Sequence, residues 1–206
     1  MNQWIKGISL LVAVGFVAIL AVQFQTIVEP ARSREIKAAC KGLRPSPTSP
    51  VYQSLAVAKE SLPKALEFTA QNHEGKSVKL SDYRGKVVVV NFWGSWCGVC
   101  ESEKPSLEAL QKKYDREDLV VLALASNSEW EPVRKKLPQG SPLTILLDPP
   151  KDASENLGAI AKSYGITAVP ESFVVDRTGQ LRYYFVNKRD WSTSIAETCI
   201  DDLVNS

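Results

Sequence analysis

The chain has 206 residues, of which 44% are hydrophobic and 23% charged, a balance typical of a globular protein with one domain and some appendages. Its formal net charge is only +2, so the composition gives no reason to expect a nucleic-acid partner. Four cysteines, one histidine and one methionine leave few side chains for a metal site, and none is expected.

An apolar segment begins the chain. Residues 7–22 contain no charge, and together with residues 23–28 they give about 20 mostly apolar residues, roughly the length that crosses a bilayer core. The sequence therefore predicts a membrane anchor over residues 1–28. A cleaved signal peptide is the alternative, and the lack of a small-x-small cleavage site after the apolar run disfavours it. Under either interpretation, the rest of the chain is exported across the membrane.

A proline-rich tether is expected over residues 29–61. Its middle, RPSPTSP at residues 44–50, is incompatible with a regular helix or a central strand and should be extended and semi-rigid. Residues 52–60 have the pattern of a short helix. From residue 62 to residue 206 the pattern is that of one globular domain, which the tether would hold away from the membrane.

The globular part alternates short apolar runs with helical patterns. Strands are expected at residues 66–69, 77–80, 87–93, 119–125, 143–147, 172–176 and 180–186. Helices are expected at residues 97–114, 129–137, 153–164 and 192–204. A turn at residues 177–179 makes the last two strands a hairpin. This order predicts an α/β fold, a central mixed sheet flanked by helices on both faces.

The most informative stretch is VVVVNFWGSWCGVC, residues 87–100. A continuous β-branched and aromatic run suits a strand buried on both faces, and it delivers a Cys-x-x-Cys to the first turn of a helix. Residues three apart in a helix share a face, so the sulfurs of Cys97 and Cys100 should come within disulfide reach. Unpaired N–H groups and the helix dipole should stabilise Cys97 as a thiolate. Cys97 is therefore expected to be the exposed attacking thiol and Cys100 the buried resolving thiol.

Two simpler interpretations of this cysteine pair are half of a zinc site and an inert bridge. The sequence lacks a second pair of ligands at a suitable spacing, which argues against zinc. The single histidine, His73, lies in the turn between the first two strands, and we interpret it as an exposed turn residue rather than a catalytic one.

The other two cysteines are Cys40, before the proline run, and Cys199, in the last predicted helix. Neither fits a metal motif, and two such cysteines in an exported protein suggest a structural disulfide. That bond would tie the tether to the last helix and would close a loop of about 160 residues, worth roughly 5 kcal/mol at most. The alternative is a pair of free thiols, with Cys199 buried.

The order of strand, WCxxC, helix, a later Val–Pro before a strand, then hairpin and helix resembles thioredoxin. The motifs that carry this resemblance are NFWGSWCGVCESEKP and VPESFVVDRTG. The predicted anchor, the additional strand pair (EFTAQNHEGKSVKLSDYRGK) and the extra helix at residues 129–137 make the chain similar to the membrane-anchored TlpA/ResA-type group, which includes the cytochrome c maturation thioredoxins. The resemblance covers residues 62–206. It implies a thioredoxin-like fold with an N-terminal strand-pair extension and an inserted helix.

The resemblance implies roles in substrate binding for three residues. Pro170 would be a cis proline that faces the dithiol, so that the backbone of Val169 lies beside Cys97 where a substrate strand can pair with it. An ordinary trans proline that opens a strand is the alternative. Trp96 would pack over the dithiol and shield the mixed disulfide, whereas Trp93 is expected in the core.

The resemblance also implies a buried carboxyl group near the dithiol. Thioredoxin has an aspartate six residues before its first cysteine, but this chain has Asn91 there, which cannot take a proton. Glu103, three residues after Cys100, would then accept and return the proton of Cys100, and burial would raise the pKa of Glu103. A solvated helix glutamate is the alternative, since Glu101 and Glu108 share this helix.

The function implied by the resemblance is that of an extracytoplasmic thiol–disulfide oxidoreductase that reduces protein disulfides, with apocytochrome c as a candidate substrate. Electrons would come from a membrane-embedded thiol donor, because the sequence carries no cofactor motif and the redox centre would be the Cys97–Cys100 pair itself. The implied location is the bacterial cytoplasmic membrane, with the catalytic domain on its periplasmic side.

Alternative functions on the same fold remain. Gly98–Val99 replaces the x–Pro that is usual between the two cysteines, and this pair influences the redox potential, so a disulfide-forming oxidase or isomerase stays open. A Sco-like copper-binding assembly factor would need Cys-x-x-x-Cys and a histidine downstream of it. A thiol peroxidase would need a proline and a threonine before its cysteine. Neither of these last two patterns is present.

Overall fold

The computed structural model describes residues 2–24, 63–137, 140–152 and 154–206, together with residues 31, 34, 35, 38 and 40. The tether expected at residues 29–61 therefore lies outside the described residues except at those five positions, and the short helix expected at residues 52–60 lies wholly outside them. The chain forms two compact units, residues 1–41 and residues 42–206.

Helix α1 (Asn2–Gln23) makes up most of the described part of the first unit. The side chains of residues 13–24 are exposed, and apolar ones such as Phe16, Val17 and Ile19 are among them. No helix in the described part of the chain combines the length and the apolar character needed to cross a membrane. The anchor expected over residues 1–28 stays a prediction.

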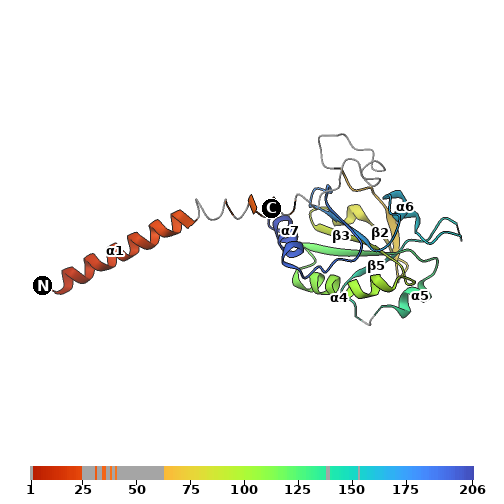
Figure 1. The fold of residues 1–206 in the computed structure, drawn as a ribbon, viewed down its shortest axis with the longest axis horizontal. Coiled ribbons are helices and arrows are strands. Elements are labelled where there is room, and N and C mark those ends of the chain that lie inside the picture. The colour runs from red at the N-terminus through yellow and green to blue at the C-terminus, as the bar shows by residue number, and fades with distance from the viewer. Residues whose placement is uncertain are drawn as a thin grey trace. The chain divides into compact units, whose positions relative to one another are not determined.

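A single mixed sheet organises the second unit, and its order within the described residues is β2-β1-β5-β4-β3-β6-β7 (Figure 1). The strands are β1 (Thr69–Asn72), β2 (Ser77–Lys79), β3 (Val87–Trp93), β4 (Leu119–Ala125), β5 (Thr144–Leu147), β6 (Glu171–Val175) and β7 (Leu181–Val186). Strands β3, β4 and β5 are parallel to one another, whereas β6 is antiparallel to β3 and β1 is antiparallel to β5. The predicted α/β fold with a mixed sheet is confirmed.

Helices cover both faces of this sheet (Figure 1). They are α4 (Gly98–Lys113), α5 (Trp130–Lys135), α6 (Ala159–Ser163) and α7 (Ser194–Val204), with a short 3-10 helix, η2 (Leu80–Tyr83). Helices α4 and α7 lie side by side, because Lys113 forms an ion pair with Glu197 at 3.3 Å. On the opposite face, Tyr164 at the end of α6 packs against Phe92 and Phe173 with ring centroids 5.4 Å away in each case. The core cluster on that face holds β3, β4 and β6 together.

Two expected elements differ from the structure by three or more residues at one or both ends, and the other expected strands and helices of the globular domain differ by at most two. The strand expected at residues 66–69 is β1 at Thr69–Asn72, because Leu66 and Phe68 pack into the core and the Leu66 carbonyl accepts from the Tyr164 hydroxyl. The helix expected at residues 153–164 is only α6, Ala159–Ser163. Its start is set by Asp148, whose carboxylate accepts from the backbone N–H groups of Ile160 and Ala161 at 2.8 and 2.9 Å. These contacts are long-range, so the local pattern did not contain them.

The sheet brings two loops to the same edge. Strand β3 ends at Trp93 and leads into the Cys-x-x-Cys, while β6 is antiparallel to it and begins at Glu171, which pairs with Phe92. Pro170, the residue before β6, therefore lies at the edge where β3 delivers Cys97. The register of these two central strands positions the functional site.

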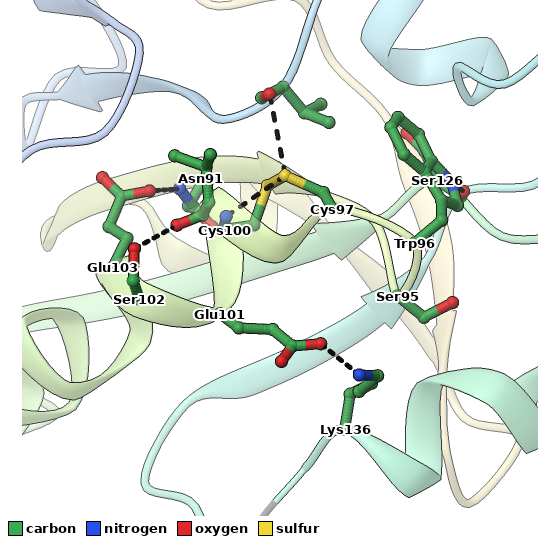
Figure 2. Close-up of a disulfide and its surroundings, with 12 residues drawn as sticks. Asn91, Ser95, Trp96, Cys97, Cys100, Glu101, Ser102, Glu103, Ser126 and Lys136 are labelled. Atoms are coloured by element: carbon green, nitrogen blue, oxygen red, sulfur yellow. Dashed lines mark hydrogen bonds and ion pairs between the residues drawn. A yellow bond between two sulfur atoms is a disulfide. The ribbon is translucent and has the colours of Figure 1, made fainter.

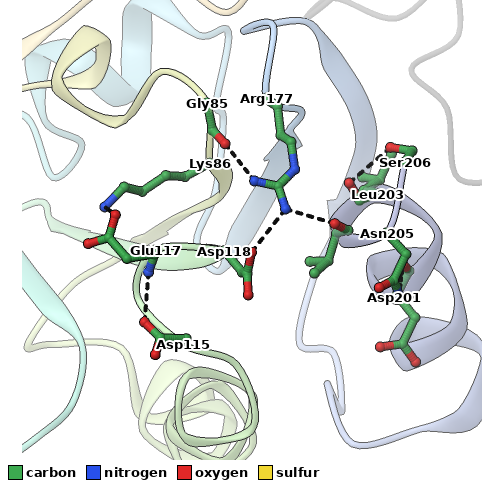
Figure 3. A network of polar contacts seen from close by, with 11 residues as sticks. Gly85, Lys86, Asp115, Glu117, Asp118, Arg177, Asp201, Leu203, Asn205 and Ser206 are labelled. Atoms are coloured by element: carbon green, nitrogen blue, oxygen red, sulfur yellow. Dashed lines mark hydrogen bonds and ion pairs between the residues drawn. The ribbon is translucent and has the colours of Figure 1, made fainter.

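The opposite edge of the sheet is fastened by Arg177, which follows β6 (Figure 3). Its guanidinium donates to the Gly85 carbonyl at 2.6 Å, to the Asp118 carboxylate at 3.1 Å and to the Val204 carbonyl at 2.7 Å. One side chain thus connects the segment before β3, the segment before β4 and the end of α7.

Candidate functional site

The two cysteines of the CGVC motif form a disulfide at the start of α4, with Cα atoms 5.3 Å apart. Cys97 is the N-cap residue of α4, and its sulfur accepts a hydrogen bond from the backbone N–H of Cys100 at 3.1 Å. The disulfide reach expected from the spacing is confirmed. The N-terminal end of a helix directs partial positive charge at this sulfur, which favours a thiolate when the bond is reduced.

Cys97 is less accessible than the sequence suggests. Its exposed fraction is 8% and that of Cys100 is 2%, so Cys97 is the more accessible of the two but is still buried. The expectation of an exposed Cys97 is therefore wrong for the disulfide form, because its sulfur is bonded to Cys100 and lies 3.7 Å from the Val169 carbonyl oxygen. The Val169–Pro170 loop therefore borders the Cys97 sulfur, and an incoming group must approach Cys97 next to it.

The Val169–Pro170 peptide bond is cis. The loop lies opposite the disulfide, as the 3.7 Å between the Val169 carbonyl oxygen and the Cys97 sulfur shows. The structure therefore brings together Cys97, Cys100, Val169 and Pro170, although more than 60 residues separate the two pairs along the chain.

Glu103 is buried one helical turn after Cys100, with an exposed fraction of 2%. Its Oε1 atom accepts from the Arg189 backbone N–H and the Trp191 indole N–H, both at 3.0 Å. Its Oε2 atom accepts from the Asn91 side chain at 3.4 Å. Burial raises the pKa of Glu103 above its ordinary value, and the three hydrogen bonds oppose part of that rise. The alternative of a solvated glutamate is excluded at this position.

Asn91 occupies the position that an aspartate holds in thioredoxin, and it is buried beside Glu103. Its amide also donates to the Ser172 hydroxyl at 2.9 Å, across the pairing of β3 with β6. Figure 2 shows Asn91 and Glu103 on one side of the disulfide, and Trp96 with Ser126 on the other.

Trp96 is half-exposed, with an exposed fraction of 52%. Its indole N–H donates to the Ser126 carbonyl at 3.1 Å, and its ring lies so close to Gly94 that a Cβ atom there would be 2.7 Å from it. Shielding of a mixed disulfide by Trp96 stays a prediction. Trp93 is buried, as expected for a core residue, and the Lys104 amine lies 4.1 Å from the centre of its ring.

A second buried carboxyl group, Glu171, directly follows Pro170. It accepts a hydrogen bond from the Tyr184 hydroxyl at 2.5 Å, and burial raises the pKa of Glu171. The sequence analysis does not predict Glu171 as a site residue, although a glutamate at the start of a buried strand indicates a buried carboxyl group. Trp191 was not predicted either, and its sequence signal is one large aromatic residue in a polar stretch.

All four cysteines lie among the described residues, and none of them is free. Cys40 and Cys199 are each buried and disulfide-bonded. The expected bond between them stays a prediction.

Within the described residues, no group of three or more His, Cys, Asp or Glu side chains could hold a metal ion. His73 is exposed in its turn, with its ring 6.4 Å from that of Trp130.

Comparison with known proteins gives a consistent family. Residues 63–184 match the AhpC/TSA family. The chain is 31% identical over 137 residues to the thiol-disulfide oxidoreductase ResA of Bacillus thuringiensis subsp. konkukian, a match that covers 64% of this chain and 74% of that relative. It is 32% identical over 120 residues to the ResA of Bacillus cereus, with 57% and 64% covered.

Solved structures agree with this family. A Chlorobium tepidum protein assigned as the thiol:disulfide interchange protein DsbE superposes with a TM-score of 0.61 at 30% identity, over 71% of this chain and 99% of that one. The thioredoxin domain of a thiol-disulfide oxidoreductase from Bacteroides vulgatus superposes with a TM-score of 0.57 at 24% identity, over 71% and 99%, and supports the fold alone. The chain therefore belongs to the AhpC/TSA family, as a thiol–disulfide oxidoreductase of the ResA type with a thioredoxin-like fold.

Proposed function

We propose that this enzyme reduces disulfide bonds in other proteins through the Cys97–Cys100 dithiol, without a bound cofactor. The observation that carries the proposal is the position of this disulfide, which caps α4 and faces the cis Val169–Pro170 loop. A disulfide at a helix N-terminus exchanges readily with other thiols, because the helix stabilises the leaving thiolate.

In the first step, the Cys97 thiolate attacks one sulfur of a substrate disulfide. A bond forms between Cys97 and that sulfur, the substrate disulfide breaks, and the second substrate sulfur leaves as a thiolate that takes a proton from water. The Cys100 N–H that now donates to the Cys97 sulfur at 3.1 Å supports the attacking thiolate. The backbone of Val169 is the proposed contact for the substrate chain, Pro170 holds that backbone opposite Cys97, and Trp96 flanks the contact.

In the second step, Cys100 loses its proton to the Glu103 carboxylate and attacks the Cys97 sulfur. The Cys97–Cys100 disulfide forms and the mixed disulfide breaks. The substrate leaves as a dithiol, having gained two electrons in total. Glu103 suits this proton transfer because its burial raises its pKa toward the working pH. An external dithiol must then reduce the Cys97–Cys100 bond to complete the cycle.

The proposed setting is outside the cytoplasm of a bacterium, with the N-terminal segment as a membrane anchor. The proposed substrates are protein disulfides, with apocytochrome c first among them, and the proposed electron donor is a membrane-embedded thiol protein. The support comes from the resemblance to the ResA-type group and from the apolar run at residues 7–22. The bonded state of Cys40 and Cys199 also supports an oxidising compartment, and we propose a structural disulfide between them.

The redox potential of the Cys97–Cys100 pair tests the direction of electron flow. We expect the full chain, equilibrated in thiol buffers, to be a reductant with a potential below about −200 mV. The Cys97→Ser variant should then fail to reduce a model protein disulfide such as insulin. A potential near −120 mV, which is roughly that of a strong disulfide-forming oxidase, would reverse the proposed direction and support the oxidase alternative.

A further inference from the structure

The turn that carries Ser95 and Trp96 to Cys97 is held by the loop after β4. The backbone N–H of Ser95 donates to the Asn127 side-chain oxygen at 2.9 Å. The Asn127 amide in turn donates to the Ser95 hydroxyl at 2.7 Å. This reciprocal pair joins residues 32 positions apart and uses both ends of the Asn127 side chain. Such a pair restrains a turn more strongly than one hydrogen bond, because it restrains both position and rotation.

The neighbouring residue, Ser126, anchors the same loop. Its carbonyl accepts from the Trp96 indole at 3.1 Å, and its backbone N–H donates to the Trp93 carbonyl at 2.7 Å. Its hydroxyl accepts from the Gly158 backbone N–H at 3.0 Å, just before α6. The loop is therefore fastened to the sheet and to the start of α6 while it holds Trp96.

The result is a fixed apolar surface beside the nucleophile. Trp96 is half-exposed, although its ring is restrained by Ser126 on its N–H and by Gly94 underneath. In the described part of the second unit, the exposed large hydrophobic side chains are Trp96, Val99, Val186 and Ile195. Two of these, Trp96 and Val99, lie within two residues of Cys97 along the chain. A restrained aromatic ring binds with a smaller entropy cost than a mobile one.

A substrate that reacts with Cys97 comes close to this surface. The substrate sulfur has to come within bonding distance of the Cys97 sulfur, beside which the Val169 carbonyl oxygen lies at 3.7 Å. Trp96 directly precedes Cys97 and lies on one side of the disulfide (Figure 2), so the residues next to the substrate cysteine pass near its ring. Contact with an apolar side chain is favourable there, because the indole face is otherwise in water.

We propose that Asn127 is a positioning residue that acts through Trp96, and that together they select substrate disulfides whose cysteine is flanked by an apolar residue. The proposal rests on the proposed reduction of protein disulfides by Cys97 and adds a substrate preference to it. Asn127 holds Ser95, Ser95 sets the direction of Trp96, and Trp96 offers the contact. Asn127 itself touches no reacting atom in this scheme.

Two disulfide-bonded peptides that differ only in the residue beside one cysteine, leucine or serine, test the preference. We expect the reduced full chain to have a kcat/KM roughly fivefold higher for the leucine peptide than for the serine peptide. This ratio is small because Trp96 offers an open surface, and an enclosed pocket would discriminate between the two residues more strongly. The Asn127→Ala variant should lose this preference through a higher KM for the leucine peptide. The Asn127→Asp variant should keep it, because its two oxygens can accept from the Ser95 N–H and the Ser95 hydroxyl.

Two further variants separate positioning from general damage. In the Trp96→Ala background, adding Asn127→Ala should leave the ratio of the two rates unchanged, since the group through which Asn127 acts is already gone. Asn72→Ala is the matched control, because the Asn72 side chain accepts from Glu74 and Lys76 in the distant β1–β2 turn, and it should keep the wild-type ratio. If Asn127→Ala does not fold, Ser95→Ala removes half of the reciprocal pair and should lower the ratio by a smaller factor.

The outcomes distinguish this proposal from the one on which it rests. Equal rates on the two peptides with the wild-type enzyme would overturn the substrate preference, and an unchanged ratio in Asn127→Ala would overturn the positioning role; neither result would count against the reductase function. A further fall of the ratio when Asn127→Ala is added to Trp96→Ala would also overturn it, since Asn127 would then act by another route. Reduction of neither peptide by the wild type would count against the proposed reductase function and, with it, against the preference.

Discussion

At the scale of single residues, Glu103 shows how burial and hydrogen bonding act against each other on one carboxyl group. Burial disfavours the charged form, whereas the donors from Arg189, Trp191 and Asn91 favour it. The net direction is a raised pKa, so burial is the larger effect. A carboxyl group of this kind can exchange a proton with Cys100 closer to neutral pH than a solvated glutamate can.

We expect Glu103→Gln to slow the second step of disulfide exchange at neutral pH, because Cys100 then loses its proton acceptor. The expected loss is on the order of 100-fold, the lower end of what a general base contributes. Rapid-quench measurement of mixed-disulfide decay, over a range of pH, checks this. The matched control is Glu101→Gln, two residues away, where a partly exposed carboxylate is paired with Lys136 at 2.5 Å. Equal effects of the two substitutions would contradict the role of Glu103.

Glu103 should also make the stability of the fold depend on pH. Since the pKa of Glu103 is raised in the folded protein, the folded state binds its proton more tightly than the unfolded state does. Ionisation therefore lowers the stability as the pH rises from 4.5, the ordinary pKa of a glutamate, through the raised pKa of the folded state. A tenfold difference in proton affinity between the two states corresponds to about 1.4 kcal/mol. Urea denaturation at several pH values should show this decline in the wild type, and a flatter curve in Glu103→Gln.

At the scale of elements, the short helix α6 depends on a side chain from the end of β5. Asp148 is fully buried and accepts from the N–H groups of Ile160 and Ala161. A Cβ atom on Gly158, the residue before the helix, would come within 2.1 Å of this carboxyl group, so the close approach requires glycine. Since α6 carries Tyr164 onto the core at its end, the cap supports packing as well as the helix itself.

Asp148→Ala should therefore destabilise the domain by about 2 kcal/mol, because a buried N–H group of Ala161 and a partly buried one of Ile160 lose their acceptor. The free energy of unfolding from urea denaturation measures this loss. Asp152→Ala is the control, since Asp152 accepts from the Ser154 backbone in an exposed turn of the same segment. The expected loss for the control is below about 0.5 kcal/mol. A similar loss for both variants would show that Asp148 has no special part in forming α6.

At the scale of the whole domain, the edge of the sheet opposite the disulfide is held by Arg177. Three segments that are far apart in the sequence meet at its guanidinium, through the Gly85 and Val204 carbonyls and the Asp118 carboxylate (Figure 3). Arginine suits this position because its planar guanidinium holds donors in a rigid fork that reaches acceptors on several sides, whereas the donors of lysine all leave one nitrogen. The edge with Arg177 thus serves to hold the domain together, whereas the edge with the disulfide carries the redox site.

Arg177→Lys should lower the free energy of unfolding by about 2 kcal/mol, since at least one carbonyl acceptor loses its donor. Thermal or urea unfolding checks the loss. The rate of disulfide reduction below the transition should stay at the wild-type value, because the substitution is at the far edge of the sheet. Arg134→Lys, on the exposed surface of α5, is the control and should change neither quantity. A slower reaction in folded Arg177→Lys would show that the two edges are coupled.

Much of the domain was predictable because the signals were local. Strands β3 and β4 have the expected bounds, since runs of valine, leucine, alanine and aromatic residues, interrupted only by Asn91, suit strands with both faces buried. The Cys-x-x-Cys spacing at the start of a helix places both sulfurs on one face of that helix, and the Cys97–Cys100 disulfide follows from this spacing. The prediction for Pro170 depended on the likeness of its motif to thioredoxin, and the cis bond agrees with it.

The sequence by itself determined the order of the elements, the mixed sheet and the reactive pair, because periodicity and spacing act over a few residues. The tertiary structure decided that Glu103 is turned inward and buried, whereas Glu101 pairs with Lys136 at the surface. It also decided that Asn127 holds Ser95 and that Trp191 meets Glu103, contacts between residues 32 and 88 positions apart. Such contacts form only when the register of β3, β4 and β7 brings the segments that follow them to one edge, and a local pattern holds no information about that register.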